Sequence, residues 1–202
     1  VKDIKVHVDL YVPQLEELKL ENKYDNIYLG NIKSNLTVRL YSGQMEAGNI
    51  NGNVALHLKY SKVSIGNILD GDFDIYDSKL KLLKANNLKL KSKYSDGTIG
   101  PTQNLELDTY DDDFEIGNIE NELTLEDKYS EFEFGSFIKG RMKLHDVDIK
   151  MDNAKTLNVQ SKYSDFQIEN VDQLSFSMSY DDNWTIYALG EMEGESKYTE
   201  FR

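Results

Sequence analysis

The residues best suited to chemistry are aspartates that occur in short clusters at expected turns. Three of them are consecutive and two are adjacent, and each cluster follows a tyrosine: Asp111, Asp112, Asp113, Asp181 and Asp182. Carboxylate oxygens at turns suit Ca²⁺, and paired carboxylates also serve glycoside hydrolysis. Their spacing matches neither an EF-hand nor the glycine-rich nonapeptide of calcium β-rolls. We therefore interpret them mainly as solvating charge and keep all five as weak calcium candidates.

A second group consists of lysines and aromatic residues that alternate at a fixed interval. At one position of successive repeats they are Lys23, Tyr41, Lys59, Tyr76, Lys93, Tyr110, Lys128, His145, Lys162, Tyr180 and Lys197. In a stack each lysine would lie between aromatic rings, with cation–π contacts of roughly 0.5–1 kcal/mol each. The next position alternates tyrosine with aspartate or serine, so each of those phenols is predicted to lie between carboxylates or a hydroxyl. We interpret both positions mainly as stabilising ladders.

Some of these rings also form a candidate binding row. Exposed aromatic side chains suit recognition because they combine a large apolar body with a polar tip. If they face solvent, the contact residues are Tyr41, Tyr76, Tyr110 and Tyr180.

Catalytic machinery is not expected. His7, His57 and His145 are the only histidines, and none stands in a recognisable nucleophile motif. The chain has no cysteine, which excludes disulfides and thiolate metal sites. No glycine-rich phosphate loop precedes a helix. We predict a protein without cofactors that is not an enzyme.

An internal repeat in the sequence predicts the secondary-structure elements that position these side chains. Aligning on the first apolar residue after each tyrosine turn gives anchors spaced by 17 or 18 residues: Ile27, Met45, Val63, Leu80, Gly97, Phe114, Phe132, Ile149, Phe166, Trp184 and Phe201. Apolar residues recur two positions after and seven before the anchor, so each unit holds two runs of period-two alternation. That period is typical of strands.

Short strands repeated at one register predict an all-β fold, a single-stranded parallel β-helix of about eleven turns. Each turn would lie over the last at about 4.8 Å, which gives a rod roughly 50 Å long. The apolar positions do not recur every six residues, as they do in left-handed hexapeptide helices, so a right-handed coil is favoured. The constant unit length leaves no long loop to build an enzyme cleft.

Glycine and asparagine mark one corner of the unit. Six glycines stand three positions after the anchor, where a tight corner would favour positive φ: Gly30, Gly48, Gly66, Gly100, Gly117 and Gly135. Asparagine often follows, and stacked asparagines can hydrogen-bond along the axis.

We expect one domain over residues 1–202. In residues 1–17, apolar and polar residues alternate from Ile4 to Val12, which predicts an N-terminal capping strand and first partial turn. Residues 18–202 would form the repeating turns. The sequence stops at Arg202 in the middle of a unit, so we expect either a further C-terminal segment or a partner that covers the strand edge, for example a second copy bound end to end.

The overall charge limits the classes of molecule that the chain is expected to bind. The net charge is −13, which disfavours nucleic acid because its phosphates require clustered Lys and Arg. An anionic membrane surface is disfavoured for the same reason. No apolar run approaches the roughly 20 residues of a membrane span. The sequence starts at Val1 and shows no signal peptide, which is compatible both with cleavage of an export signal and with a sequence that has been shortened at this end.

The chain resembles a known bacterial family. The opening Leu10-Tyr11-Val12-Pro13, the stretch from Leu18 to Tyr24 and the repeated Gly-Asn-Ile units are similar to adhesin-like envelope domains of unknown function, such as the head GIN domain of autotransporter adhesins. The resemblance covers nearly the whole chain. It implies a parallel β-helix, export to the periplasm or cell surface, and no known catalytic residues.

The repeat predicts a non-enzymatic module that binds a glycan or a protein, or that acts as a scaffold, and the resemblance implies that it lies in the cell envelope or at the cell surface. Two alternatives stay open. One is a carbohydrate-active enzyme that uses Asp111, Asp112, Asp113 or Asp181, and the other is a purely structural spacer. A cleft with convergent carboxylates would favour the enzyme, whereas a flat flank would favour the binder.

Overall fold

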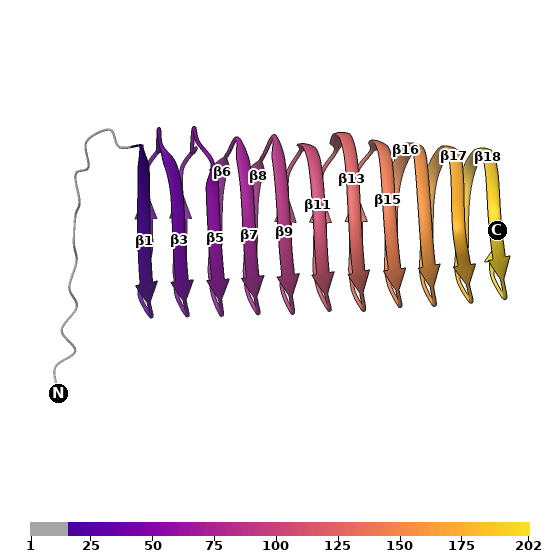
Figure 1. Ribbon diagram of the computed structural model, residues 1–202, viewed down its shortest axis with the longest axis horizontal. Coiled ribbons are helices and arrows are strands. Elements are labelled where there is room, and N and C mark those ends of the chain that lie inside the picture. The colour runs from indigo at the N-terminus through magenta and orange to yellow at the C-terminus, as the bar shows by residue number, and fades with distance from the viewer. Residues whose placement is uncertain (1–15) are drawn as a thin grey trace.

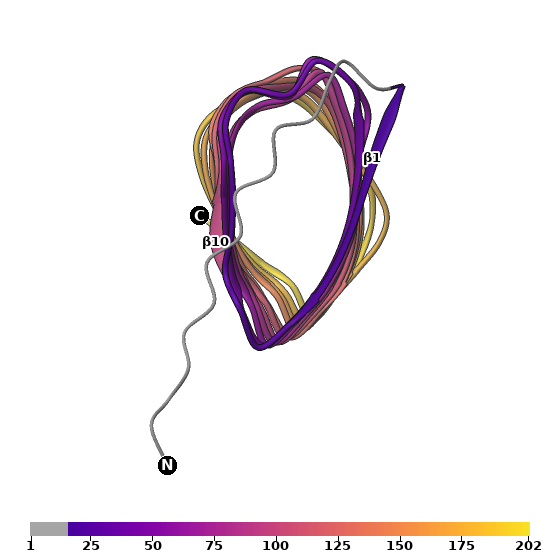
Figure 2. The same cartoon turned by 90° about the vertical axis from the view of Figure 1, so that its left-hand side faces the viewer.

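Residues 16–202, which the computed structural model describes, form one parallel β-solenoid of about eleven coils (Figure 1). In Figure 1 the near strands run down and the far strands run up while the chain advances from left to right. Seen from the N-terminal end in Figure 2, the chain turns clockwise as it recedes, so the coil is right-handed. The predicted fold class is confirmed.

One side of the solenoid is a parallel sheet of longer strands. It contains β1 (Glu17–Lys23), β3 (Asn35–Tyr41), β5 (Val54–Lys59), β7 (Asp70–Tyr76), β9 (Asn87–Lys93), β11 (Thr102–Tyr110), β13 (Ile119–Lys128) and β15 (Phe137–His145), then the later parts of β16 (Asp148–Lys162), β17 (Asp165–Tyr180) and β18 (Asn183–Lys197). The last residue of each of these strands carries the lysine–aromatic alternation.

The opposite side is a parallel sheet of shorter strands. It contains β2 (Ile27–Leu29), β4 (Gln44–Ala47), β6 (Lys62–Asn67), β8 (Lys79–Lys84), β10 (Asp96–Ile99), β12 (Asp113–Ile116) and β14 (Glu131–Phe134), the first parts of β16, β17 and β18, and β19 (Glu200–Phe201). In the last coils the chain continues through the corner as strand, so one long strand contributes to both sheets.

The register is the one that the anchors predict. Phe114 pairs with Phe132 and Phe132 pairs with Ile149, so these residues occupy successive layers of one interior column. All three are at most 1% exposed. Because the sheets are parallel and in register, like side chains stack and close a continuous apolar core.

The glycine corner works differently from the prediction. Among residues 16–202, Gly194 is the only glycine with positive φ, so none of the six corner glycines adopts it. At Gly48, Gly66 and Gly135 an added Cβ would lie 2.4–2.5 Å from the amide oxygen of an asparagine in the preceding coil. Glycine is therefore needed there for close approach between coils, not for its backbone freedom.

The predicted asparagine ladder is confirmed at this corner. The Asn31 Oδ1 accepts a hydrogen bond from the Asn49 backbone N–H at 2.8 Å, and the Asn49 Oδ1 accepts one from Asn67 N–H at 2.9 Å. Asn31 and Asn49 thus each tie their own coil to the next.

The N-terminal prediction lies almost wholly outside the described residues. The expected capping strand from Ile4 to Val12 belongs to residues 1–15, and the first described strand, β1, begins at Glu17.

Candidate functional site

The turn between the long and short strands is the feature that repeats most regularly. Its central residue has φ between 44° and 69° in every one of the eleven coils: Tyr24, Ser42, Tyr60, Asp77, Tyr94, Asp111, Tyr129, Asp146, Tyr163, Asp181 and Tyr198. This left-handed conformation costs a non-glycine residue roughly 1–2 kcal/mol. Aspartate adopts it more readily than tyrosine does, so the six tyrosines are the costly choice.

A second ladder of hydrogen bonds supports this turn. The Ser78 Oγ accepts a hydrogen bond from Ser61 N–H at 3.0 Å and donates one to the Tyr76 carbonyl at 2.8 Å. The Ser95 Oγ makes the equivalent bonds to Ser78 N–H and the Lys93 carbonyl. Backbone groups that the turn removes from the sheet are thereby satisfied inside the rod.

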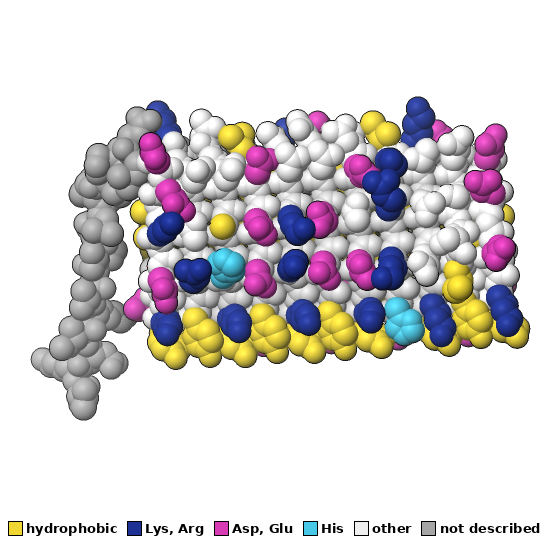
Figure 3. All heavy atoms as spheres, viewed as in Figure 1, with side chains coloured by type: hydrophobic (Ala, Val, Ile, Leu, Met, Phe, Trp, Pro, Cys, Tyr) yellow, Lys and Arg dark blue, Asp and Glu magenta, His cyan; other side chains and the backbone are white. Residues whose placement is uncertain are grey.

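The turn brings all the predicted rings into one continuous row, which we call the aromatic row. Ten tyrosines and His145 follow one another with centroid distances of 5.4–5.9 Å and interplanar angles of 72–89°. Edge-to-face pairs at this distance contribute about 0.5–1.5 kcal/mol each. Figure 3 shows the row as alternating yellow and dark-blue side chains along one edge of the rod, with one cyan histidine in the row.

The row contains two classes of ring. The turn tyrosines are Tyr24, Tyr60, Tyr94, Tyr129, Tyr163 and Tyr198, and they are 43–72% exposed. The strand-end rings are Tyr41, Tyr76, Tyr110, His145 and Tyr180. Of the four predicted binding tyrosines, all of which are strand-end rings, Tyr41 is 38% exposed and Tyr76, Tyr110 and Tyr180 are partly exposed.

The turn tyrosines were missed as binding candidates. The sequence does contain a pattern that could have indicated them, because tyrosine recurs directly after lysine at the position where other coils have aspartate. Their greater exposure follows from the left-handed turn.

The predicted lysine–ring contacts are confirmed for Lys59, Lys93, Lys162 and Lys197, whereas within residues 16–202 Lys23 and Lys128 lie over no ring. The Lys59 Nζ lies 5.9 Å from the Tyr76 ring centroid, and the Lys162 Nζ lies 4.6 Å and 5.2 Å from the centroids of Tyr163 and Tyr180. The turn tyrosines, however, contact the strand-end rings of the neighbouring coils. Along the rod axis they nevertheless alternate with Ser42, Asp77, Asp111, Asp146 and Asp181, as predicted, while the turn brings both ring classes into one line.

Hollows lie on both sides of the aromatic row near its N-terminal end. On the short-strand side, a hollow of about 530 Å³ is lined by Tyr60, Asp77 and Tyr94 together with Gln44, Lys62 and Lys79. On the long-strand side, a smaller hollow of about 180 Å³ includes Tyr41 and Tyr76 with Lys23, Lys59 and Arg39. Rings are therefore accessible from two directions.

The predicted aspartates do not converge. Asp111 and Asp113 are exposed, whereas Asp112 between them is only 4% exposed. Asp181 is exposed and Asp182 is 1% exposed. Within residues 16–202 no group of three or more carboxylate, histidine or cysteine side chains is placed to hold a metal ion.

The two buried aspartates replace serine in the hydrogen-bond ladder. The Asp112 Oδ1 accepts a hydrogen bond from Ser95 N–H at 2.6 Å. Asp182 accepts hydrogen bonds from the Ser161 and Ser179 hydroxyls and from Ser164 N–H, at 2.6–2.9 Å. The interpretation of these two residues as solvating charge is wrong, because their side chains point into the rod.

Burial changes the acidity of this ladder. Desolvation raises the pKa of Asp112 to about 7, against the lowering effect of hydrogen bonds that include the one from Ser95. Desolvation also raises the pKa of Asp127, a third buried aspartate, which accepts a hydrogen bond from the Ser130 hydroxyl. The negative charge of Asp127 raises the pKa of Asp112 further.

An unbroken column of carboxylates runs beside the turn on the short-strand side. Strand pairing places five acidic residues in successive coils: Asp96, Asp113, Glu131, Asp148 and Asp165. Lys79 forms an ion pair with Asp96, and Lys150 forms one with Glu131. Desolvation and then the charges of Asp165, Glu131 and Asp146 raise the pKa of Asp148.

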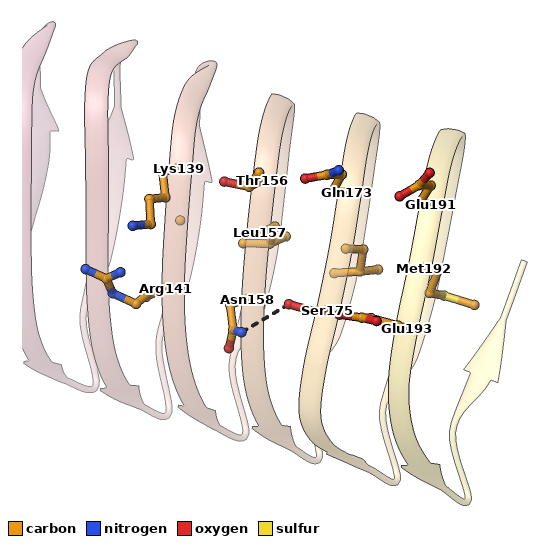
Figure 4. Close-up of a pocket in the computed structure, with 12 residues that line it drawn as sticks. Lys139, Arg141, Thr156, Leu157, Asn158, Gln173, Ser175, Glu191, Met192 and Glu193 are labelled. Carbon is orange, nitrogen blue, oxygen red and sulfur yellow. Dashed lines mark hydrogen bonds between the residues drawn. The ribbon is translucent and has the colours of Figure 1, made fainter.

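A larger hollow of about 760 Å³ lies on the long-strand face near the C-terminal end. Figure 4 shows its outward side chains on neighbouring coils, with cations toward one end, uncharged groups in the middle and carboxylates at the other: Lys139, Arg141, Thr156, Asn158, Gln173, Ser175, Glu191 and Glu193. In β17, a bulge at Ser177 and Met178 follows the residues that line this hollow. It shifts the register of β17 against β16 and against β18. Sequence reasoning missed this hollow, and none of the five predicted aspartates lines it.

No protein-family model, curated protein or solved structure matches the chain. The resemblance to adhesin-like envelope domains therefore stays a prediction. Over residues 16–202, no helix is long and apolar enough to cross a membrane.

Proposed function

We propose that this chain is a non-enzymatic binding module that recognises an extended polymer along its aromatic row. The observation that carries the proposal is the exposed tyrosine held at positive φ in every second coil. Backbone strain of this kind clusters at functional sites, and aspartate in the alternate coils shows that the fold does not require an aromatic residue there.

The setting that we propose is the bacterial cell envelope, either the periplasm or the cell surface. It rests on the resemblance to adhesin-like domains. A rigid rod with a repeating edge suits an adhesin-like or scaffold role, because a polymer can contact many coils at once and gain affinity by multivalency.

A binding role fits the acidic residues better than glycosidase chemistry does. A glycosidase needs two carboxyl groups that face one substrate, whereas Asp112 and Asp182 are buried away from Asp111, Asp113 and Asp181.

Self-association end to end is a further part of the proposal. On the last coil, Leu189, Met192 and Phe201 are 37–46% exposed, and Phe201 stacks on Trp184 and Phe176. Sedimentation velocity over a range of concentrations would test it, since a single species at all concentrations would refute it.

The binding role can be tested with a triple variant, Tyr60→Asn, Tyr94→Asn and Tyr129→Asn. Asparagine tolerates positive φ, so the turns should keep their shape while three rings are lost. On a glycan array and on bacterial envelope extracts we expect at least about tenfold weaker binding than for the unsubstituted protein, which corresponds to about 1.4 kcal/mol.

The matched control is Leu83→Asn with Ile138→Asn, which removes two exposed apolar side chains outside the aromatic row. It should bind as the unsubstituted protein does. Equal binding by all three proteins, or binding by none of them, would refute the proposed role of the aromatic row.

A further inference from the structure

The hollow between Tyr60 and Tyr94 has the composition of a sugar-binding site. Two exposed tyrosines, two coils apart, bound a space of about 530 Å³ that contains the Asp77 side chain. Gln44, Lys62 and Lys79 add amide and ammonium groups to the lining. Aromatic faces pack against the C–H surfaces of sugars, and carboxylate, amide and ammonium groups hydrogen-bond hydroxyls, so both halves of a sugar's chemistry are served.

The bracketing of an acidic residue by two turn tyrosines recurs along the row, while carboxylates from Asp96 to Asp165 take the place of Gln44, Lys62 and Lys79 on the short-strand side. Each later pair of turn tyrosines also brackets an exposed aspartate at positive φ: Tyr94–Asp111–Tyr129, Tyr129–Asp146–Tyr163 and Tyr163–Asp181–Tyr198. We call each such unit a bay, defined by its two tyrosines and the aspartate between them. Neighbouring bays share a tyrosine, so the bays form one uninterrupted series.

The spacing of the bays limits the occupant. Two coils advance by about 9.6 Å, at about 4.8 Å each. An extended peptide repeats every two residues, or about 6.7 Å, so its side chains would drift out of step with the tyrosines. In an extended β-linked polysaccharide every second sugar presents the same face, and two sugars are close to two coils in length. One sugar per coil would keep the chain in step with the rings.

The charges flanking the row favour an uncharged chain. Lysines alternate with rings on the long-strand side, whereas the column from Asp96 to Asp165 lies on the short-strand side. An acidic polysaccharide would meet that carboxylate column, and a cationic one would meet the lysines. A neutral chain avoids both repulsions.

We propose that the bays bind a neutral, extended β-linked polysaccharide whose chain runs parallel to the rod axis, with two sugars per bay. This inference rests on the proposed binding function and names the class of its ligand. Affinity then increases in steps of two sugars, because each added pair occupies one more bay.

Titration calorimetry with β-1,4-linked oligosaccharides of glucose and of N-acetylglucosamine, in lengths of four, six and eight sugars, tests the ligand class. We expect each added pair to raise affinity by at least about threefold, as bays fill in series. The α-1,4-linked glucose oligosaccharides of the same lengths, whose chains curve, should show no such series.

Two single variants test the path of the chain. Tyr94 bounds two bays in the interior of the row, whereas Tyr198 bounds one bay at its end. Affinity should increase less between four and eight sugars for Tyr94→Asn than for Tyr198→Asn. Leu83→Asn should leave the affinities of the whole oligosaccharide series unchanged.

The outcomes separate this inference from the function on which it rests. Binding that depends on the turn tyrosines but occurs only with proteins, acidic polysaccharides or α-linked chains overturns the ligand class and leaves the binding function intact. If β-linked chains bind and Tyr94→Asn does not weaken their binding, the proposal that they bind in the bays is refuted. If no ligand is found whose binding depends on the aromatic row, both the ligand class and the proposed binding function are refuted.

Discussion

At the residue scale, the left-handed turn governs the candidate site. Six tyrosines hold φ between 54° and 69°, although the steric cost of this conformation favours Gly, Asn or Asp. Ring-to-ring contacts on both sides and the serine hydrogen bonds beneath offset that cost. The same conformation places the rings at the edge of the rod, where solvent and ligands reach them.

Two substitutions of Tyr94 measure this cost. Tyr94→Asn loses two edge-to-face contacts but relieves the backbone, so the free energy of unfolding should change by less than about 1 kcal/mol. Tyr94→Val also loses the contacts and places a β-branched residue at positive φ, so it should be less stable than the asparagine variant by about 2 kcal/mol. Urea unfolding of both variants makes the comparison, and equal stabilities would contradict the argument.

A buried acid makes stability depend on pH. The pKa of Asp112 rises from the ordinary 3.8 to about 7 in the folded chain, so the folded state keeps a proton that the unfolded state has lost. Its contribution to stability is full below about pH 4 and is lost as pH rises through about 7. The loss is at most about 4 kcal/mol, at 1.36 kcal/mol per pKa unit.

Asp112→Asn should flatten part of this pH dependence. Asparagine can still accept the hydrogen bond from Ser95 N–H and carries no charge to desolvate beside Asp127. We expect the variant to gain stability relative to the unsubstituted chain at pH 8 and to gain little at pH 4, as measured by urea unfolding. A stability gain of the same size at both pH values would show that the carboxylate is ionised throughout.

At the element scale, alternation with period two was enough to predict which residues face the core. The interior column of Phe114, Phe132 and Ile149 follows from the anchor spacing alone. The turns were less predictable, because one residue at positive φ decides which of its neighbours points inward. Asp111, Asp112 and Asp113 look equivalent in the sequence, yet only the middle one is buried.

A second interior column, formed by Ile116, Phe134 and Met151, gives a severe test of the register. Phe134 is 2% exposed, and its ring lies 5.5 Å from that of Phe132. Phe134→Asp would bury a charge between two coils, so the protein should unfold or lose most of its stability. Circular dichroism melting is the measurement, and an unchanged melting temperature would refute the packing.

The carboxylate column should weaken the short-strand sheet. Asp148 lies between Glu131 and Asp165, and like charges directly opposite each other destabilise paired strands. Asp148→Asn should raise the melting temperature, with a gain of roughly 0.2–1 kcal/mol per relieved pair. The matched control, Asp96→Asn, removes the partner of Lys79 and should give no gain.

At the scale of the whole molecule, each coil contacts mainly the coils before and after it. Stability is then close to a sum of nearest-neighbour terms, and opening starts at the ends. Backbone amides in the interior strands β7 to β15 should exchange hydrogen more slowly than those in β18 and β19. Hydrogen exchange with mass spectrometry measures this, and uniform protection along the rod would indicate a single cooperative unit.

The whole rod was predictable from sequence, whereas the candidate site was predictable only in part. A strict repeat fixes the stacking, so the coil number and the ring contacts of Lys59, Lys93, Lys162 and Lys197 followed directly. The repeat does not reveal which of two adjacent aromatic positions projects further, and the more exposed turn tyrosines were therefore overlooked. It also hides the bulge at Ser177 and Met178, because the extra residue makes the unit from Phe166 to Trp184 18 residues long, a spacing that other units share.

The turn residue is tyrosine in one coil and aspartate or serine in the next. A pair of coils is therefore the smallest segment that could be duplicated while every side chain kept the same type of neighbour in the coils on either side. Duplication of about 35 residues would insert a further Lys-Tyr and Tyr-Asp layer in the proper order, whereas duplication of a single coil would set two lysines or two acids against each other. The length of such a rod can therefore evolve by steps of two layers, and a gene in this lineage that grew or shrank by an odd number of layers would have to repair the mismatch by further substitution.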